Sequence, residues 1–264
     1  MSADSRLVYR GMDIGTAKPT TAERARVPHH CIDLLDPGEP YDAARYRRDA
    51  LAALSAISSR GRAAVLVGGT GLYVRAMLDG LDLESVPRDP ALRARLETLA
   101  TDDLFAQLSQ LDADAAAVAR GNRRRAIRYL EIATLRGAVR ATQRQGPPLP
   151  AMRVGLAPPI AHVDAAIERR TRQMVDDGVL EETRGLVARG LDPKLPSMTG
   201  HGYVHWSAHL AGTLTLDEAI ARTVRDTRAY ARRQMTWFRR DPEIRWSDPT
   251  KGDPLADILR LVAQ

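Results

Sequence analysis

An apolar run that leads directly into a glycine-rich turn is the feature that most restricts the fold of this chain. Residues 63–67 (AAVLV) are all apolar, which is the pattern of a parallel strand buried on both faces. Residues 68–71 (GGTG) follow, and a helix is predicted over 72–78. A strand, a glycine turn and a helix start in this order aim backbone N–H groups and a helix dipole at one point, which suits an anion. The alternative is a tight turn whose glycines serve only the backbone. The spacing matches neither a dinucleotide fingerprint nor a P-loop, so it leaves both open.

Apolar periodicity predicts mostly helices in the rest of the chain, with a few short strands, so the expected fold class is α/β. The helices are expected over about 41–60, 91–100, 102–110, 113–120, 122–136, 162–176, 179–189 and 215–240, with a short one within 248–264. Strands are expected at 152–157 and 244–246, a strand and a turn within 20–40, and a turn at 196–203. His29, His30 and Cys31 do not have the spacing of a metal site. His201 and His205 are four residues apart and could reach one ion, but no third ligand or glutamate motif lies near them, so no metal site is expected there.

Residues 81–150 differ in character from the sequence on either side. A proline-bearing connection over 81–90 is followed only by predicted helices, and Pro147, Pro148 and Pro150 close the block. We therefore predict a helical insertion over 81–150, attached to an α/β core formed by residues 1–80 and 151–264.

Basic charge is concentrated in this predicted insertion. The chain has a formal net charge of +6, and residues 120–145 alone contain eight arginines against one acid, Glu131. An arginine-rich total can reflect codon bias, but a solvated face normally interleaves both signs, so the clustering indicates contact with a polyanion. Arg124, Arg125 and Arg128 project away from the apolar side of one predicted helix. The pattern favours binding of a nucleic acid.

The sequence carries no sign of export. Its single cysteine, Cys31, excludes an internal disulfide framework and fits a reducing compartment. No apolar run approaches the roughly 20 residues of a membrane span, and no basic region leads into an apolar one at the N-terminus. We expect a cytoplasmic protein that contacts no membrane.

The opening stretch, residues 1–19 (MSADSRLVYRGMDIGTAKP), places a carboxylate beside a hydroxyl at Asp4 and Ser5. A short apolar run at 7–9 follows. The polar residues 13–19 have no amphipathic period, so they are expected to form a loop that lines a site. Taken alone, an Asp-Ser pair is most often a turn or a helix cap.

Four segments, in order along the chain, resemble one protein family. They are residues 1–19, 66–81 (LVGGTGLYVRAMLDGL), 123–132 (RRRAIRYLEI) and 227–241 (TRAYARRQMTWFRRD). Together they are similar to the tRNA dimethylallyltransferases, also called tRNA isopentenyltransferases. The resemblance implies a P-loop-NTPase-like parallel sheet core with an α-helical tRNA-binding insertion. It also implies that a dimethylallyl group moves from dimethylallyl pyrophosphate to the exocyclic amine of the adenosine 3′ to the tRNA anticodon. The enzyme would be a monomer that uses Mg²⁺.

The same resemblance implies roles for particular residues. Asp4 is the candidate base that accepts the amine proton, and Thr70 is the residue that orients the amine. The matching tRNA-contacting positions are Asp4, Ser5, Arg6, Leu7, Thr70, Arg93, Arg124, Arg125, Ala126, Ile127 and Arg128. The matching pyrophosphate-binding positions are Arg170 and, more weakly, Arg232 and Arg233, since arginine stabilises the charge of a leaving pyrophosphate.

One element of the family is absent from this sequence. Members begin with a strand, a P-loop of the G-x-x-x-x-G-K-[ST] type and its helix, whereas this chain contains no Gly-Lys pair. The difference is about 30 residues, the length of one strand–loop–helix unit. The Ser or Thr of that loop would hold Mg²⁺, so no metal ligand is expected in this chain. We expect a truncated or mis-started reading of a longer enzyme, with in-frame P-loop codons directly upstream in the DNA.

Two other functions remain open at this point. A non-catalytic RNA-binding protein would keep the basic helices but lack the donor site, and a small-molecule phosphotransferase would share the core. The predicted insertion argues against the phosphotransferase, because a small substrate needs no arginine-rich helix.

Overall fold

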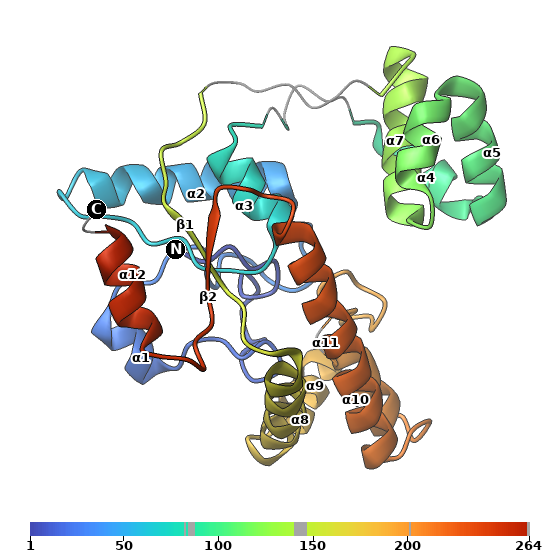
Figure 1. The fold of residues 1–264 in the computed structure, drawn as a ribbon. Coiled ribbons are helices and arrows are strands. Elements are labelled where there is room, and N and C mark those ends of the chain that lie inside the picture. The colour runs from blue at the N-terminus through green and yellow to red at the C-terminus, as the bar shows by residue number, and fades with distance from the viewer. Residues whose placement is uncertain (82, 84–87, 140–146, 201, 263–264) are drawn as a thin grey trace. The chain divides into compact units, whose positions relative to one another are not determined.

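The computed structural model describes residues 1–81, 83, 88–139, 147–200 and 202–262. The chain divides into two compact units (Figure 1). Unit 1 comprises Met1–Leu78 and Leu149–Gln264, and unit 2 comprises Asp79–Pro148. Each unit has a hydrophobic core of its own.

Unit 1 combines helices with parallel strand pairing. Its elements are α1 (Thr21–Arg26), α2 (Ala43–Ser58), α3 (Gly71–Leu78), β1 (Arg153–Leu156), α8 (Ile160–Asp176), α9 (Val179–Ala188), α10 (Tyr203–Leu210), α11 (Leu216–Phe238), β2 (Ile244–Ser247) and α12 (Pro254–Val262). β1 pairs in parallel with β2, and the register places Arg153 opposite Ile244. An isolated parallel bridge joins Tyr9 to Leu35. Parallel pairing of segments that are separated by helices is the arrangement of an α/β fold.

The prediction of a buried strand at 63–67 is wrong. Val67 forms a single parallel bridge with Ser2, but Val65 and Val67 are 70% and 66% exposed. Residues two apart in an extended segment point to the same side. That side of the segment is therefore left uncovered by the described part of the chain, whereas Leu66 packs against a buried cluster on the other side. An apolar run shows that both sides suit burial, but not that both find a partner.

The other predicted helices and the strands predicted at 152–157 and 244–246 are present within a few residues. The strand expected within 20–40 does not form, and the sequence patterns miss α1 and α10. α1 begins at a capping box in which Thr20 and Glu23 exchange both hydrogen bonds, within the segment that was expected to hold a strand and a turn. α10 follows Gly202, which has a positive φ of 91°, and buries Tyr203 and Trp206. Short helices contain too few apolar repeats for periodicity to reveal them. None of the described helices is both long and apolar enough to cross a membrane.

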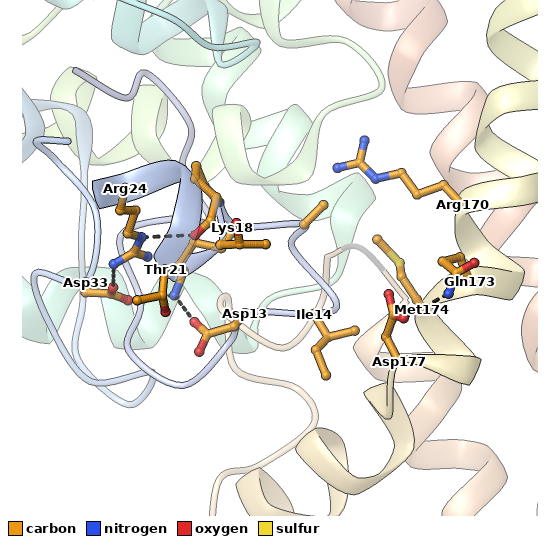
Figure 2. A pocket seen from close by; sticks show the side chains of 13 residues that line it. Asp13, Ile14, Lys18, Thr21, Arg24, Asp33, Arg170, Gln173, Met174 and Asp177 are labelled. Carbon is orange, nitrogen blue, oxygen red and sulfur yellow. Dashed lines mark hydrogen bonds and ion pairs between the residues drawn. The ribbon is translucent and has the colours of Figure 1, made fainter. Parts of the chain in front are cut away.

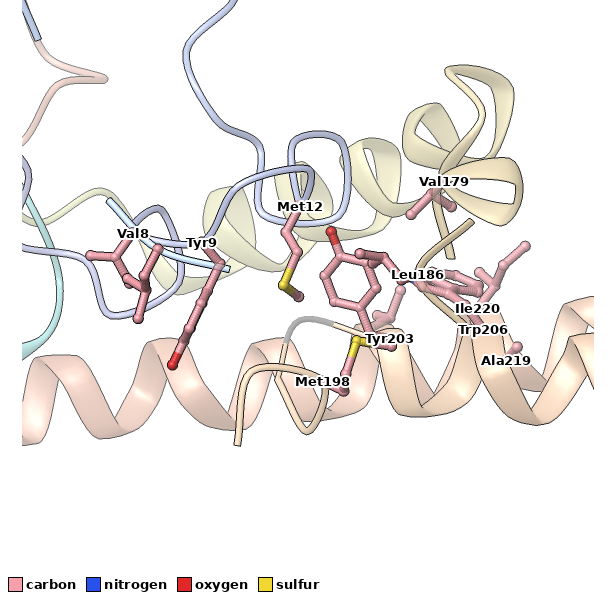
Figure 3. Close-up of a cluster of buried hydrophobic side chains, with 12 residues drawn as sticks. Val8, Tyr9, Met12, Val179, Leu186, Met198, Tyr203, Trp206, Ala219 and Ile220 are labelled. Atoms are coloured by element: carbon pink, nitrogen blue, oxygen red, sulfur yellow. The ribbon is translucent and has the colours of Figure 1, made fainter. Parts of the chain in front are cut away.

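The opening stretch is held in place by the main core of unit 1. Val8, Tyr9 and Met12 pack with Tyr203 and Trp206 (Figure 3), and each of these side chains is at most 4% exposed. Burial of one large apolar side chain contributes about 1.5–3 kcal/mol. Apolar packing therefore fixes this stretch even though it forms no regular element.

A single carboxylate anchors the loop that follows. Glu182, in the first turn of α9, accepts hydrogen bonds from the backbone N–H groups of Asp13 (2.7 Å), Ile14 (2.8 Å) and Gly15 (3.0 Å). It also accepts a hydrogen bond of 2.6 Å from the Tyr203 hydroxyl, whose pKa is raised by burial and by the nearby carboxylate. A Cβ at Gly15 would lie 2.5 Å from the Tyr203 ring, so the loop can approach this closely only with glycine.

Unit 2 is built from helices in its described residues. They are α4 (Pro90–Thr98), α5 (Thr101–Leu111), α6 (Ala113–Ala119) and α7 (Arg123–Arg136). Leucines and alanines fill the core, and Leu104 and Leu130 are at most 1% exposed. Asp89, Asp112 and Asn122 cap α4, α6 and α7, each by accepting a backbone N–H in the first turn. The short connections and the caps set where each helix starts.

The anchoring of the loop by Glu182 predicts the effect of Glu182→Gln. The amide nitrogen cannot accept hydrogen bonds, so we expect a loss of about 2 kcal/mol in the free energy of unfolding and faster amide hydrogen exchange at residues 13–15. Denaturant unfolding and exchange measurements check both. Glu181→Gln is the control, because Glu181 is exposed and its described partner is Arg184 at 3.4 Å. Equal effects of the two substitutions would contradict the anchoring role.

Candidate active site

Asp4 and Thr70 are brought together in unit 1. The backbone N–H of Ser5, the residue after Asp4, donates to Thr70 Oγ1 at 3.0 Å, and the N–H of Thr70 donates to the Ala3 carbonyl at 3.1 Å. The Ala3 carbonyl lies directly against Gly68, where any side chain would collide with it. The glycine turn therefore serves the close approach of two backbone segments, and this approach sets Thr70 beside the acid.

α11 closes the glycine turn from another direction. The side-chain amide of Gln234 donates to the Gly69 carbonyl at 3.1 Å, and the indole of Trp237 packs against Gly71 with no room for a Cβ. Three segments far apart in sequence, the opening stretch, the glycine turn and α11, thus meet at one place. Gly71 begins α3, so this place also lies at the start of a helix.

The Asp4 carboxylate is only half engaged. Its Oδ1 accepts the backbone N–H of Arg6 at 2.7 Å, and no hydrogen bond to Oδ2 is found within the described residues. The Arg6 guanidinium turns the other way and donates to the carbonyls of Pro196 and Ser197, so it braces a neighbouring turn. A partly buried carboxylate with one free oxygen can accept a proton from a bound group.

A cavity of about 360 Å³ lies between the polar loop and α8 (Figure 2). Its lining residues are Asp13, Ile14, Ala17, Lys18, Pro19, Thr20, Thr21, Arg24, Asp33, Arg170, Gln173, Met174 and Asp177. The volume falls within the range of small-molecule sites, about 300–1,000 Å³. Most of the segment 13–19, which is predicted to line a site, lines this cavity.

The charges in this cavity are mostly paired. The Lys18 side chain is 1% exposed, and its ammonium donates to the Tyr9 carbonyl at 2.7 Å and to Asp13 and Asp33 at 2.6 Å each. Arg24 pairs with Asp33 at 2.7 Å. Partial burial alone would raise the pKa of the Asp33 carboxyl, but the hydrogen bonds from Lys18 and Arg24 outweigh it and lower that pKa.

Arg170 differs from the other cations of the lining. It is exposed on α8, and its guanidinium has no hydrogen bond or ion pair with the described residues. Of the three arginines proposed to bind pyrophosphate, it is the one that lines the cavity. The Arg233 guanidinium instead lies 5.7 Å from the centre of the Tyr230 ring. An anion entering this cavity would meet Arg170 first.

Two arginines of α11, one of them a candidate for pyrophosphate binding, are paired with acids of α8. Arg232 pairs with Asp164 at 2.8 Å, and Arg228 pairs with Glu168 at 3.2 Å. The two acids are four residues apart on α8, so they share the face that packs against α11. Arg232 would have to leave Asp164 in order to bind pyrophosphate.

The candidate tRNA-contacting residues of unit 2 fall into separate groups. Arg124 is exposed and has no ion pair among the described residues, whereas Arg93 and Arg128 are held by a buried glutamate. Ala126 and Ile127 are 0% and 5% exposed, so their side chains belong to the core of the unit and do not face solvent. Contact of these two residues with RNA would have to use the backbone.

Two arginines of the same helix have other tasks. Arg123 donates to the carbonyls that end α4, at Glu97 and Leu99, and Arg125 donates to the Val118 carbonyl at 3.1 Å. Arginines near a helix C-terminus satisfy its last carbonyls. Arg140 and Arg144, which contribute to the predicted basic cluster, lie outside the described residues, as does His201.

Sequence reasoning missed Glu182, Lys18 and Gln234 as residues that shape this site. Their partners lie 5 to 169 residues away along the chain. The one local signal was Lys18, one of three lysines in an arginine-rich chain.

Metal ligands are sparse in this arrangement. Within the described ranges, no group of three or more His, Cys, Asp or Glu side chains is placed to hold a metal ion. The residues present therefore do not form a Mg²⁺ site of their own.

Comparisons with known proteins agree on the fold. The full-length tRNA isopentenylpyrophosphate transferase of Bacillus halodurans superimposes with a TM-score of 0.72 at 38% identity, over 98% of this chain and 84% of that one. A eukaryotic dimethylallyltransferase that acts on tRNA has the same fold, with a TM-score of 0.71 at 23% identity over 94% of this chain. These matches define the class: an α/β protein with a P-loop-NTPase-like core.

The family follows from sequence. The model of the IPP transferase family (IPPT) matches residues 7–241. The tRNA dimethylallyltransferase of Roseiflexus sp. (strain RS-1) is 47% identical over 251 residues, which are 92% of this chain and 82% of that protein. This chain belongs to the IPP transferase family.

The lowered pKa of Asp33 predicts a pH-dependent effect of Asp33→Asn. A carboxyl whose pKa is lower in the folded state stabilises the fold above its unfolded pKa, and this contribution is lost as the pH falls through the folded value. We expect Asp33→Asn to cost about 2 kcal/mol at pH 7, with the difference from the parent shrinking below about pH 4. Denaturant unfolding at several pH values measures it. The control is Asp36→Asn, since Asp36 is 55% exposed and pairs only with exposed arginines in the described part of the chain. A cost that does not change with pH would refute this assignment.

Proposed function

We propose that this protein transfers a dimethylallyl group to tRNA. Its family membership and the tRNA dimethylallyltransferases that it matches over most of its length support this function. The observation that carries the proposal is the meeting of Asp4 with Thr70 beside the glycine turn. We propose that the acceptor is the exocyclic amine of the adenosine 3′ to the anticodon, and that the donor is dimethylallyl pyrophosphate.

The chemistry requires a base, an orienting group and a cation. The amine nitrogen forms a bond to C1 of the dimethylallyl group, the C1–O bond breaks, and pyrophosphate leaves with the bonding electrons. An amine conjugated to a purine is a weak nucleophile, so removal of its proton by the free oxygen of Asp4 assists the attack. Thr70 orients the amine, and its Oγ1 is itself fixed by the N–H of Ser5. Arg170 stabilises the charge that develops on the pyrophosphate.

Access to the adenosine is cheap in an anticodon loop. A base in a single-stranded loop leaves its stack at a cost of a few kcal/mol, less than a paired base. We propose that unit 2 holds the surrounding RNA through Arg93, Arg124, Arg125 and Arg128, with Ser5, Arg6 and Leu7 of the opening stretch close to the base. Phosphate contacts of this kind supply affinity, while Asp4 and Thr70 act on the base itself.

Three further parts of the proposal depend on the family. Mg²⁺ is the metal ion that the family resemblance implies, and the Ser or Thr that would hold it belongs to the P-loop unit. The enzyme would work as a monomer in the cytoplasm, where its tRNA substrate is found.

A second candidate function is RNA binding without transfer. The observation in its favour is that the given sequence contains no Gly-Lys pair of the P-loop type. Incubation with unmodified tRNA and labelled dimethylallyl pyrophosphate separates the two functions. Label in the tRNA supports the transferase. Binding of tRNA without label supports the second function. If the chain neither transfers label nor binds tRNA, both functions are contradicted.

Asp4→Ala tests the role of the base. We expect a fall in kcat of about 10²-fold or more, because proton transfer by a positioned side chain contributes about 10²–10⁴-fold. The Kd for tRNA should stay within about twofold, since phosphate contacts dominate affinity. Single-turnover transfer and filter binding measure the two quantities. Asp36→Asn, at an exposed carboxylate of the same unit, should leave both unchanged, and an unchanged kcat for Asp4→Ala would exclude Asp4 as the base.

A further inference from the structure

Among the described residues of unit 2, one carboxylate is fully buried. Glu131 on α7 is 0% exposed. Its Oε1 accepts the backbone N–H of Asp89, the residue that caps α4, at 3.0 Å. Its Oε2 lies 2.6 Å from Nη1 of Arg128 and 3.5 Å from Nη1 of Arg93. One oxygen thus serves the start of α4, and the other lies between two guanidinium groups from different helices.

Stability alone is a weak reason for this arrangement. Removing a carboxylate from water costs several kcal/mol, and a buried ion pair can often be replaced by apolar residues without loss. Unit 2 already has a well-filled core of leucines and alanines. A buried charge in such a unit therefore suggests a task other than holding the helices together.

The two partners of Glu131 share a face with a third arginine. Arg124, Arg128 and Glu131 follow steps of four and three along α7, so their side chains lie on one side of the helix. Arg93 reaches the same carboxylate from α4. We call Arg93, Arg124 and Arg128 the arginine face. Arg123 and Arg125 donate to backbone carbonyls instead, so they help to join the helices of the unit.

We infer that Glu131 is a positioning residue for RNA binding, which orients Arg93 and Arg128 toward phosphates before the RNA arrives. The inference rests on the proposed function, in which unit 2 holds tRNA. A free arginine loses rotamer entropy when it grips a phosphate, and a side chain that is already ordered loses less. Glu131 uses one oxygen for two guanidinium groups, and a guanidinium carries five N–H donors, more than this single contact uses.

The substitution Glu131→Gln separates two effects on RNA binding, the orientation of Arg93 and Arg128 and the net charge of the protein. The substitution raises the net charge of +6 by one, so electrostatic attraction alone would tighten binding to RNA. Loss of orientation would weaken it. The amide also cannot serve both sides of the site, because its nitrogen would face either two guanidinium groups or the Asp89 N–H. The opposite signs of the two effects make the outcome informative.

The experiment measures the Kd of the full chain for labelled unmodified tRNA by fluorescence anisotropy at several salt concentrations. We expect Glu131→Gln to raise the Kd about tenfold. Glu97→Gln is the matched control, since it removes an exposed carboxylate that also contacts Arg93, at 3.3 Å. It should leave the Kd unchanged or slightly lower. Binding by Glu131→Gln that equals or exceeds that of the parent would overturn the inference.

A second variant keeps the test decisive if Glu131→Gln fails to fold. Arg128→Lys retains the charge but loses the planar group that contacts Glu131, so we expect a rise in Kd of about fivefold. Arg95→Lys, at an exposed position of α4, should have no effect. An unchanged Kd for Arg128→Lys would overturn the inference. A parent chain that does not bind tRNA would refute the proposed function itself, and the inference with it.

Discussion

The contact between the opening stretch and the glycine turn is the constraint on which the candidate site depends. The Ala3 carbonyl can accept the N–H of Thr70 only because Gly68 has no side chain in the way. That approach brings the Ser5 N–H to Thr70 Oγ1 and leaves Asp4 beside it. α11 then covers the turn through Gln234 and Trp237. A side chain at position 68 would separate the acid from the threonine, whatever the rest of the fold did.

Charged groups inside both units organise the surfaces around them. Glu182 collects three backbone N–H groups of the polar loop, and Lys18 ties the same loop to two carboxylates. In unit 2, Glu131 does the same for Arg93 and Arg128. In each case a group that would be costly to bury alone is satisfied by several partners, which fixes the shape of an irregular or solvent-facing segment. Arg170 is left as the cavity cation without an ion pair in the described residues, which is why the proposed pyrophosphate site is placed there.

Long helices were predictable from the sequence, whereas short helices and the burial of individual faces were not. α7 and α11 have apolar stripes, caps and breakers that are visible in sequence, and their bounds agree with expectation within a few residues. α1 and α10 are too short for periodicity, although the Thr20 and Glu23 capping box marked α1. The strand expected at 63–67 was wrong because apolar composition does not reveal which faces find a partner. The ion pairs of Arg228 and Arg232 could not be read from sequence either, since their counter-ions Asp164 and Glu168 lie on another helix.

The sequence by itself determined the α/β class, the basic helical segment and the resemblance that pointed to Asp4, Thr70 and Arg170, because these depend on local pattern and on residue identity. Only the tertiary structure decided which of the arginines are engaged and which carboxylates hold them. Ion pairs and hydrogen bonds between distant residues depend on distances of a few ångströms, and no local pattern of residues specifies such distances. The same limit applies to the meeting of Asp4 with Thr70, which are 66 positions apart and adjacent only because a glycine lets two backbones touch.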